Sequence, residues 1–376
     1  MEKSRRVLLA VSSLTGGGAE RVVTLWAGEL AELGYDVAIF VLNRREREYP
    51  VSPKVAILSA APTHEEYLAL GYFQRFRVIR GILRTFSPDY VISFLYNAQL
   101  WMMLTSVGLG IRRVETLRIN PWEMEKSMGR ISRILWRLCF RTSHAIILQT
   151  PSQAGWLSGR QRKKSVVIPN PVAAEYLQGE GCKVGPVVRN FVAAGRLCEQ
   201  KNYGMMIEGF AAVAKSHPDL RLRIFGSGER EYVHTLKEHI CRLGMEQQIT
   251  LEGRSLAMME EYDKSDAFLM TSDYEGLPNA LIEAMARCLV AISTDCLTGP
   301  ADLIDNRVNG YLVALGDAEA LARTIESVLE MSVEERGRMS QLARQKIGEF
   351  CAPERSVCKL QELMEGRRNE SHKKML

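Results

Sequence analysis

Two glutamates, Glu275 and Glu283, stand eight positions apart in a stretch whose residue types suit the binding of a sugar nucleotide. Glu275 lies in the turn E-G-L, Pro278 is expected at the first position of a helix, and Glu283 lies inside that helix. The first N–H groups of the helix belong to Asn279, Ala280 and Leu281. Unpaired N–H groups at a helix start bind phosphate, and carboxylates accept hydrogen bonds from sugar hydroxyls. The alternative is an ordinary amphipathic helix with a surface glutamate in its loop.

A second pair of residues, Arg196 and Lys201, follows a strand that is expected to end at Gly195. Open α/β sheets bind ligands at the carboxyl ends of their strands, so both cations are expected at a binding edge. A guanidinium binds two phosphate oxygens at once, and fixed positive charge stabilises a diphosphate. The pair therefore predicts a diphosphate site, with solvated surface charges as the alternative.

The elements around these residues alternate between strand and helix over most of the chain. Short apolar runs that indicate buried strands occur at 7–11, 36–42, 55–58, 90–94, 145–148, 220–225, 249–253, 267–270 and 290–293. This alternation predicts parallel sheets that are covered by helices on both faces. We expect 145–148 to be the last strand of a first domain, and the proline-bounded segment V-V-I-P-N-P-V at 166–172 to be its connector to a second.

Several of these motifs resemble those of one known family. The string S-D-Y-E-G-L-P-N-A-L-I-E-A-M-A at 272–286 and the pattern G-R-L-x-x-x-K-N at 195–202 are similar to signatures of the retaining GT-B glycosyltransferases of the GT4 type. The resemblance extends from Gly16 to Val313 and includes the segment G-G-G-A-E-R-V after the first strand. It implies an α/β protein of the GT-B fold, with two facing Rossmann-like, doubly wound parallel-sheet domains and the active site in the cleft between them.

The resemblance also implies roles for individual residues. Arg196 and Lys201 would bind the donor diphosphate, and Glu275 would bind a sugar hydroxyl; these three are the expected catalytic residues. The expected donor-binding residues are Glu283, Asn279, Ala280, Leu281, Gly17, Gly18, Gly228 and Arg254. In this family the leaving diphosphate itself accepts the acceptor's proton, so no general base, cofactor or metal ion is expected.

On the acceptor side the sequence departs from the family pattern. Many relatives carry a histidine close to the transferred sugar, in the region that here reads E-T-L-R-I-N-P-W-E at 115–123. The segment R-I-N-P resembles a variant found in some polysaccharide enzymes. The acceptor-side candidates are Glu20, Arg118 and Asn120, and we expect either Arg118 or Asn120 to stand in for the histidine.

The chain is long enough, at 376 residues, for two domains with separate cores. We expect an acceptor-side domain over 1–170 and a nucleotide-sugar-binding domain over 171–350. A helix over 351–366 would cross back to the first domain, and 367–376 would form a basic tail.

The composition is that of an ordinary globular protein, with 46% hydrophobic and 25% charged residues. The eight cysteines form no C-x-x-C pair and no Cys/His cluster, so neither a zinc site nor a disulfide framework is expected. The apolar run at 7–11 is too short for a signal peptide, and no stretch reaches the roughly 18 apolar residues of a membrane span. We expect a cytoplasmic location, with peripheral attachment to the inner face of the membrane as a further possibility.

Positive charge is concentrated in the first half of the chain, where Lys and Arg outnumber Asp and Glu. Two helices expected there, at 72–86 and 130–141, carry arginines beside apolar stripes. The stripe of the second consists of Ile131, Ile134, Leu135 and Leu138. A basic amphipathic helix can lie on an anionic membrane. The alternative is that both stripes pack into the domain core and the arginines are solvated.

The resemblance thus implies transfer of a hexose or N-acetylhexosamine from a UDP-sugar to a saccharide acceptor, with retention at the anomeric carbon. The acceptor is expected to be lipid-linked, in the assembly of bacterial surface polysaccharide or glycoprotein glycan. One alternative is a sugar-nucleotide epimerase of the same fold, which would bind the donor and transfer nothing. Another is a basic module for membranes or nucleic acid, which would leave the Arg196, Lys201, Glu275 and Glu283 set unexplained; nucleic acid is not an expected partner.

Overall fold

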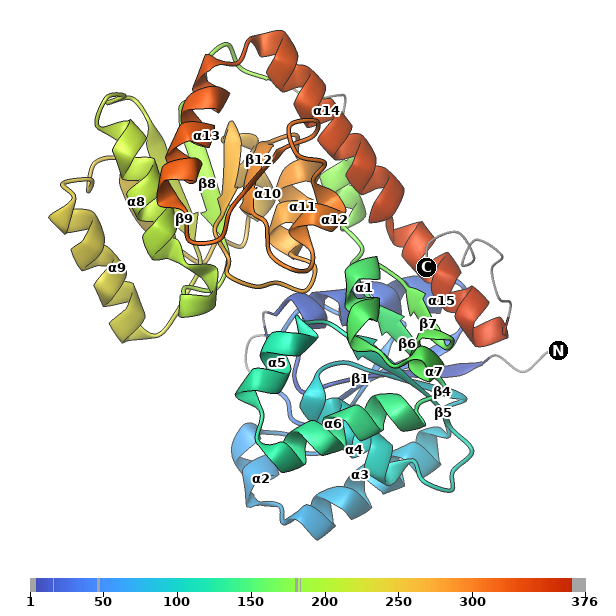
Figure 1. Ribbon diagram of the computed structural model, residues 1–376. Coiled ribbons are helices and arrows are strands. Elements are labelled where there is room, and N and C mark those ends of the chain that lie inside the picture. Colours follow the sequence, from blue (N-terminus) through green and yellow to red (C-terminus); the bar gives the residue numbers. More distant parts are fainter. Residues whose placement is uncertain (1–4, 16, 46–47, 180–181, 183, 367–376) are drawn as a thin grey trace. The chain divides into compact units, whose positions relative to one another are not determined.

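The computed structural model describes residues 5–366, except for 16, 46–47, 180–181 and 183. The chain forms two compact units (Figure 1). The first unit consists of Met1–Pro171 together with Pro353–Leu376, and the second unit is Val172–Ala352. Each unit has one parallel sheet and its own hydrophobic core. The basic tail expected at 367–376 lies outside the described residues.

The first unit is built on a parallel sheet with the strand order β3-β2-β1-β4-β5-β6-β7. Its strands are β1 (Arg6–Val11), β2 (Asp36–Val41), β3 (Ala56–Ser59), β4 (Tyr90–Ser93), β5 (Arg112–Leu117), β6 (Ala145–Leu148) and β7 (Ser165–Val167). The strand order runs outward in both directions from the β1–β4 pair, which is the doubly wound arrangement of Rossmann-like domains. Because side chains alternate along a strand, Leu9 of β1 faces one core and Leu8 faces the other.

Helices cover both faces of this sheet (Figure 1). One face is covered by α1 (Gly18–Glu32) and α15 (Pro353–Glu365), which are joined by a hydrogen bond of 3.1 Å from Trp26 Nε1 to Ser356 Oγ. The other is covered by α2 (His64–Ala69), α3 (Tyr72–Phe86), α4 (Tyr96–Thr105) and α6 (Arg130–Thr142). The remaining helices are α5 (Pro121–Ser127), the 3-10 helix η1 (Pro151–Trp156) and α7 (Gly159–Arg162).

Two strands of this sheet differ from the sequence-based expectation. The pattern R-R-V-E-T-L does not indicate β5, because Arg113 and Glu115 interrupt the apolar run; both are nevertheless buried, and Nη1 of Arg113 donates a hydrogen bond of 3.0 Å to Oε1 of Glu115. The expectation that 145–148 is the last strand is wrong, since β7 pairs with β6 in parallel. Part of the expected connector therefore belongs to the first sheet.

Helix α6 turns inward a face different from the expected stripe. Its buried residues are Trp136, Cys139 and Phe140, and the two aromatic rings pack on Trp156 with centroids 4.9 and 5.3 Å apart. Large aromatic rings bury more apolar area than the aliphatic residues beside them. Most of the expected stripe is exposed, at Ile131, Ile134 and Leu138. For α6, the alternative of an apolar stripe packed into the core is thus wrong, whereas α3 does bury Ile79 and Leu83 of its stripe.

The second unit is built on a parallel sheet with the order β10-β9-β8-β11-β12-β13. Its strands are β8 (Asn190–Ala194), β9 (Arg221–Phe225), β10 (Ile249–Gly253), β11 (Ala267–Met270), β12 (Val290–Thr294) and β13 (Tyr311–Val313). Its helices are α8 (Tyr203–Ala214), α9 (Arg230–Arg242), α10 (Met258–Asp263), α11 (Asn279–Ala286), α12 (Pro300–Leu303), α13 (Ala318–Glu330), α14 (Val333–Phe350) and the 3-10 helices η2 (Ala174–Leu177) and η3 (Glu199–Lys201). In the part of the chain that the structure describes, no helix is long and apolar enough to cross a bilayer.

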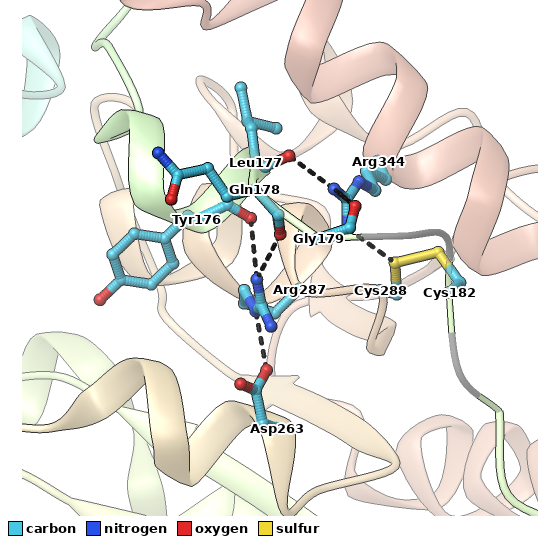
Figure 2. The surroundings of a disulfide bond; sticks show 9 residues. All are labelled: Tyr176, Leu177, Gln178, Gly179, Cys182, Asp263, Arg287, Cys288 and Arg344. Carbon is cyan, nitrogen blue, oxygen red and sulfur yellow. Dashed lines mark hydrogen bonds and ion pairs between the residues drawn. A yellow bond between two sulfur atoms is a disulfide. The ribbon is translucent and has the colours of Figure 1, made fainter.

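A disulfide bond joins Cys182 to Cys288, which lie 106 positions apart (Figure 2). The cysteine pattern gives no sign of this pair, and the expectation of no disulfide is wrong here. Cys288 lies just after α11, so the bond ties the start of the second unit to the end of that helix. Arginines bind the same segment: Arg287 donates to the carbonyl oxygens of Tyr176 and Gln178, and Arg344 to those of Leu177 and Gly179 (Figure 2).

Candidate active site

The second sheet brings the expected donor residues to one edge. Its strand order changes direction between the neighbouring strands β8 and β11, and such a switch point, at the carboxyl ends of the strands, is where open α/β sheets bind ligands. Arg196 follows the end of β8, and Glu275 follows the end of β11. The two residues therefore flank the switch point from opposite sides.

Lys201 and Glu275 are in direct contact at this edge. The Nζ atom of Lys201 lies 2.5 Å from Oε1 of Glu275, and their side chains are only 16% and 10% exposed. A buried ion pair needs good geometry to offset the loss of hydration. Arg196 is exposed, and no described residue pairs with its guanidinium. The site thus combines one neutralised cation with one that is available to an anion.

Hydrogen bonds between two loops hold Lys201 in place. Thr271 Oγ1 donates to the carbonyl oxygens of Lys201 and Asn202, at 3.0 and 2.9 Å. Asn202, whose φ of 45° is left-handed, donates through Nδ2 to Asp273 Oδ1 at 2.9 Å. Gln200 donates through Nε2 to the carbonyl oxygen of Tyr274 at 2.7 Å. The loop after β8 is therefore docked along the loop after β11.

A third segment, T-D-C-L-T-G-P at the end of β12, contacts the backbone of the loop that follows β11. Thr298 Oγ1 donates to the carbonyl oxygen of Glu275, and Cys296 Sγ lies 2.9 Å from that of Ser272. Gly299 has a φ of 99°, and a Cβ atom there would lie 2.4 Å from the carbonyl oxygen of Gly276. Only glycine fits this close approach, so the turn fixes the position of Glu275 through the backbone.

Helix α11 begins one position later than expected, with Pro278 as its N-cap residue and not its first helical residue. The N-cap makes no side-chain hydrogen bond at this end, and the start of a helix, with the positive end of its dipole, is a place that suits an anion. Glu283 lies inside the helix, 7% exposed, and Oε2 accepts a hydrogen bond of 3.4 Å from Tyr262.

The neighbouring strand ends contribute Gly228 and Arg254. Gly228 forms a parallel bridge with Leu197, and a Cβ atom at Gly228 would lie 2.0 Å from the carbonyl oxygen of Leu197. The backbone after β9 therefore lies directly against the segment that carries Arg196. Arg254 follows β10 at the edge of the sheet, is exposed, and has no described partner.

In the first unit, the glycine turn lies at the carboxyl end of β1. Gly17 is the N-cap of α1 and Gly18 its first residue. A Cβ atom at Gly17 would lie 2.1 Å from Oε2 of Glu20, so the carboxylate of Glu20 lies back against the helix start. All three candidates thus stand at one helix N-terminus. Within the first turn of α1, Glu20 is the acidic residue.

Arg118, after β5, has hydrogen-bond donors that are buried and have no partner. Its guanidinium lies over the rings of Trp26 and Phe94, at 4.5 and 5.1 Å, and Nη1 donates to Asn170 Oδ1 at 2.6 Å. Nε and Nη2 are buried and have no hydrogen-bond partner in the structure. Burial lowers the pKa of Arg118 to about 9, so the group is still positive at neutral pH. Buried N–H donors without partners are costly, so this position is suited to a ligand that supplies hydrogen-bond acceptors.

Asn120, the other acceptor-side candidate after β5, already has hydrogen-bond partners. Asn120 is 2% exposed and is the N-cap of α5, where Oδ1 accepts from the amides of Trp122 and Glu123. Sequence reasoning missed Asn170 and Gln149, which donates to Asn170 Oδ1 at 2.8 Å. Asn170 is the asparagine in V-V-I-P-N-P-V. The sequence motif alone does not show its role, because that depends on β7 placing it at the carboxyl edge of the sheet.

The structure therefore gathers the candidates into two sets. The first set lies in the second unit and contains Lys201, Glu275, the start of α11, and Gly228 beside the segment that carries Arg196. The second set lies in the first unit and contains Arg118 and Asn170. Glu283 contacts Tyr262, and Arg254 makes no described contact with the first set. Among the described residues there is no group of three or more His, Cys, Asp or Glu placed to hold a metal ion.

Two family models together match most of this chain. The model of the glycosyl transferases group 1 matches residues 189–346, and that of glycosyltransferase family 4 matches residues 16–176. The amylovoran biosynthesis glycosyltransferase AmsD of Erwinia amylovora is 27% identical over 314 residues, or 82% of this chain and 85% of that protein. A Campylobacter jejuni enzyme, named as an alpha-1,4-N-acetyl-D-galactosaminyltransferase acting on a diNAcBac-PP-undecaprenol-linked GalNAc disaccharide, is 24% identical over 86% of this chain and 89% of its own length.

Solved structures share the fold. The crystal structure of Anabaena HepE in complex with UDP has a TM-score of 0.78 at 15% identity, covering 96% of this chain and 100% of that one. Sucrose-phosphate synthase from Thermosynechococcus elongatus has a TM-score of 0.79 at 15% identity, covering 96% and 98%. With two Rossmann-like domains and both family models matched in sequence, this chain belongs to the GT4-type glycosyltransferases of the GT-B fold.

Proposed function

We propose that this protein is a retaining glycosyltransferase that moves a hexose or N-acetylhexosamine from a UDP-sugar to a lipid-linked saccharide. The first unit would be its acceptor-side domain and the second its donor-side domain. The names of AmsD and of the Campylobacter enzyme support a role in bacterial surface polysaccharide or glycoprotein glycan assembly. HepE with bound UDP supports the choice of nucleotide. The observation that carries the proposal is the Lys201–Glu275 pair beside the start of α11.

The donor diphosphate would bind between Arg196, Lys201 and the first amides of α11. Arg196 is exposed and has no described partner, so it can take two phosphate oxygens without first breaking an ion pair. Lys201 is held by Glu275 and by its own loop, so it would offer a fixed charge to the same phosphates. Gly228 and Arg254 would approach the base, and Glu283 would accept hydrogen bonds from the ribose.

The proposed reaction needs no side-chain base, cofactor or metal ion. The bond from sugar C1 to the diphosphate oxygen breaks, and the acceptor oxygen forms its bond to C1 on the same face. The acceptor's hydroxyl proton passes to the leaving diphosphate oxygen. Negative charge grows on the diphosphate, where Arg196 and Lys201 stabilise it by fixed electrostatics. Glu275, which would hold a sugar hydroxyl, stabilises the positive charge that develops on the ring.

The acceptor would meet the glycine turn and Arg118 of the first unit. Gly17 and Gly18 present backbone without side chains, and Glu20 would accept a hydrogen bond from a sugar hydroxyl. Asn120 already caps α5 through Oδ1, whereas Arg118 has two nitrogen atoms, Nε and Nη2, without hydrogen-bond partners. We therefore assign the place of the family's usual histidine to Arg118, with Asn120 positioning the segment that follows.

A lipid-linked acceptor would require contact with the membrane, and two helices are suited to it. On α6, Ile131 and Ile134 are 76% and 66% exposed, beside the exposed Arg130, Arg137 and Arg141. On α3, the exposed Tyr72 and Phe73 begin a helix whose exposed arginines include Arg77 and Arg84. Exposed apolar side chains next to cations match an anionic bilayer surface. The protein would then act at the cytoplasmic face of the membrane as a peripheral protein.

The test is UDP release from a panel of UDP-sugars, with and without a lipid-linked oligosaccharide extract. We expect one donor to give acceptor-stimulated release that persists in EDTA, is lost in Glu275→Ala and Arg196→Ala, and is kept in the control Lys215→Ala. The anomeric configuration of the product, read by NMR, should match that of the donor. Absence of both release and UDP binding would contradict the proposal, and release without a transferred sugar would instead favour an epimerase or hydrolase.

A further inference from the structure

A groove of about 800 Å³ lies in the first unit, away from the candidate active site. It is formed between the C-terminal half of α6 and the segment from η1 to the start of β7. The lining residues are Ile134, Arg137, Leu138, Arg141, Trp156, Leu157, Ser158, Arg160, Gln161 and Lys164. All of them belong to the described part of the chain, and the proposed transfer reaction uses none of them.

The floor of the groove is apolar and rigid. Trp156 packs on Trp136 and Phe140 at ring distances of 4.9 and 5.3 Å, so its position is set by the core of the domain. Ile134 and Leu138 line the groove from α6 although both are exposed, and they continue the stripe that begins at Ile131. Contiguous exposed apolar side chains mark an interaction surface.

The charge of the lining has one sign. Arg137, Arg141, Arg160 and Lys164 contribute to it, and no Asp or Glu does. Arg137 is paired with Glu125, and Lys164 donates to the carbonyl oxygens of Arg141 and Ser143. No described residue pairs with the guanidinium of Arg141 or of Arg160. These two groups leave an excess of positive charge beside an apolar floor.

The location of the groove separates it from the acceptor-side candidates. Arg141 lies in the last turn of α6, before the start of β6, and Lys164 directly precedes β7. Both therefore stand at the amino ends of parallel strands. Arg118 and Gly17 follow the carboxyl ends of β5 and β1, at the opposite edge of the sheet. A saccharide bound near Arg118 would not occupy this groove.

We propose that the groove binds one anionic phospholipid of the bilayer, with its phosphate on Arg141 and Arg160 and its acyl chain along Ile134 and Leu138. Guanidinium groups bind phosphate through paired N–H donors. The apolar floor would contact the acyl chain of the lipid, whereas a free phosphate would leave this floor exposed. This inference rests on the membrane contact proposed above and names the partner of the α6 face. The bound lipid would anchor the first unit at the bilayer while its opposite sheet edge stays open to the acceptor.

The test uses the full-length protein and a short-chain phosphatidylglycerol kept below its critical micelle concentration, titrated by calorimetry. Short-chain phosphatidylcholine, glycerol phosphate and inorganic phosphate serve as the other ligands. The variants are Arg141→Gln/Arg160→Gln and Ile134→Gln/Leu138→Gln. The control is Lys237→Gln/Arg242→Gln, which removes two exposed charges on α9 of the other unit.

We expect one molecule of phosphatidylglycerol to bind per chain. Its affinity should fall at least tenfold in Arg141→Gln/Arg160→Gln, since each cation near a lipid surface is worth about fivefold. It should also fall in Ile134→Gln/Leu138→Gln, because that variant removes apolar surface from the contact with the acyl chain. The control should bind as the wild type does, and phosphatidylcholine and glycerol phosphate should bind at least tenfold more weakly. Equal binding of inorganic phosphate and phosphatidylglycerol, or unchanged binding in both groove variants, would overturn the inference. An oligonucleotide that displaces the lipid and binds more tightly would do the same.

The same samples separate this inference from the proposed function. UDP binding is measured in parallel, and it should be equal in the wild type and in both groove variants, because the donor site lies in the other unit. If no sample binds UDP but the lipid still binds, the proposed glycosyl transfer is contradicted and the lipid groove is not. If UDP binds but no lipid binds, the lipid groove is contradicted and the proposed glycosyl transfer is not.

Discussion

The ammonium group of Lys201 lies 2.5 Å from Oε1 of Glu275 and joins two loops that are 74 positions apart in the chain. The contact stands where the strand order of the second sheet changes direction. Each partner keeps the other from being a buried, unpaired charge, which would cost several kcal/mol. The pair is therefore both part of the proposed donor site and a support of its geometry.

The two members of this pair should differ in their effects. We expect Lys201→Ala to weaken UDP binding at least tenfold, because a charge-assisted hydrogen bond to phosphate contributes about 1.5–3 kcal/mol. Glu275→Gln should leave UDP affinity within about threefold and lower kcat roughly a hundredfold, the order seen when one stabilising group is removed. Calorimetry and steady-state kinetics measure both, with Lys215→Ala as the control. If Glu275→Gln weakened UDP binding as much as Lys201→Ala, Glu275 would act only by holding Lys201.

Gly299 provides a test of the support beneath the Glu275 loop. Gly299→Ala would place a methyl group 2.4 Å from the carbonyl oxygen of Gly276 and should move the loop. We expect UDP-sugar affinity to fall about tenfold or more, because a shift of this loop also displaces Glu275. Gly316→Ala is a matched control: its φ is also positive, at 71°, but nothing lies within 4 Å of the added atom. Equal losses of UDP-sugar affinity in both variants would assign the effect to backbone strain and not to the loop.

Arg118 should act on the acceptor and not on the donor. Arg118→Lys keeps the charge but loses the planar stack on Trp26 and the forked donors, so we expect the KM for the acceptor to rise about tenfold or more. The affinity for UDP should be unchanged. Arg223→Lys, which alters another stacked arginine, over Phe225, is the control in the second unit. An unchanged acceptor KM in Arg118→Lys would remove Arg118 from the acceptor site.

The stability of the first unit should depend on pH through Glu115. Full burial raises the pKa of Glu115 to about 8, although Arg113, Lys164 and Ser93 act to lower it. The folded state then holds a proton that the unfolded state releases above pH about 4.5. The free energy of unfolding therefore falls as the pH rises from about 5 to 8, by about 1.4 kcal/mol for each unit of pKa difference.

Glu115→Gln is neutral at every pH and should lack this slope. Urea unfolding of both proteins at several pH values between 5.5 and 8.5 measures the difference. The wild type should lose stability relative to the variant as the pH rises. Parallel profiles would mean that Glu115 is ionised throughout and that its pairing with Arg113 outweighs burial.

The Cys182–Cys288 bond should stabilise the second unit (Figure 2). A cross-link that closes a loop of about 100 residues contributes up to roughly 4–5 kcal/mol in the chain-entropy description. We expect a reducing agent to lower the Tm of the wild type and to leave that of Cys182→Ser/Cys288→Ser unchanged. Thiol titration of the denatured, unreduced protein should find the other six cysteines free. Eight reactive thiols would contradict the bond.

Much of the proposed donor site follows from sequence, because local spacing decides it. Glu275 and Glu283 are separated by a turn and a helix start, and the one-position error at Pro278 does not change what they flank. The alternation of apolar runs with helical patterns likewise predicts two parallel sheets. These features depend on neighbours within about ten positions, where backbone propensity and periodicity act directly.

Tertiary structure decided what depends on distant partners. The face that α6 buries was set by Trp156, twenty positions after Trp136, and the stripe at Ile131 and Ile134 was left exposed. The strand β5 formed despite its charges because Arg113 and Glu115 found each other inside the sheet.

The contact of Lys201 with Glu275, the place of Asn170 beside Arg118 and the bond between Cys182 and Cys288 have the same origin. Each joins residues that are more than fifty positions apart. No local pattern carries information about such pairs, because their distance is fixed only when the strands take their order in the sheet and the loops at its edge pack together.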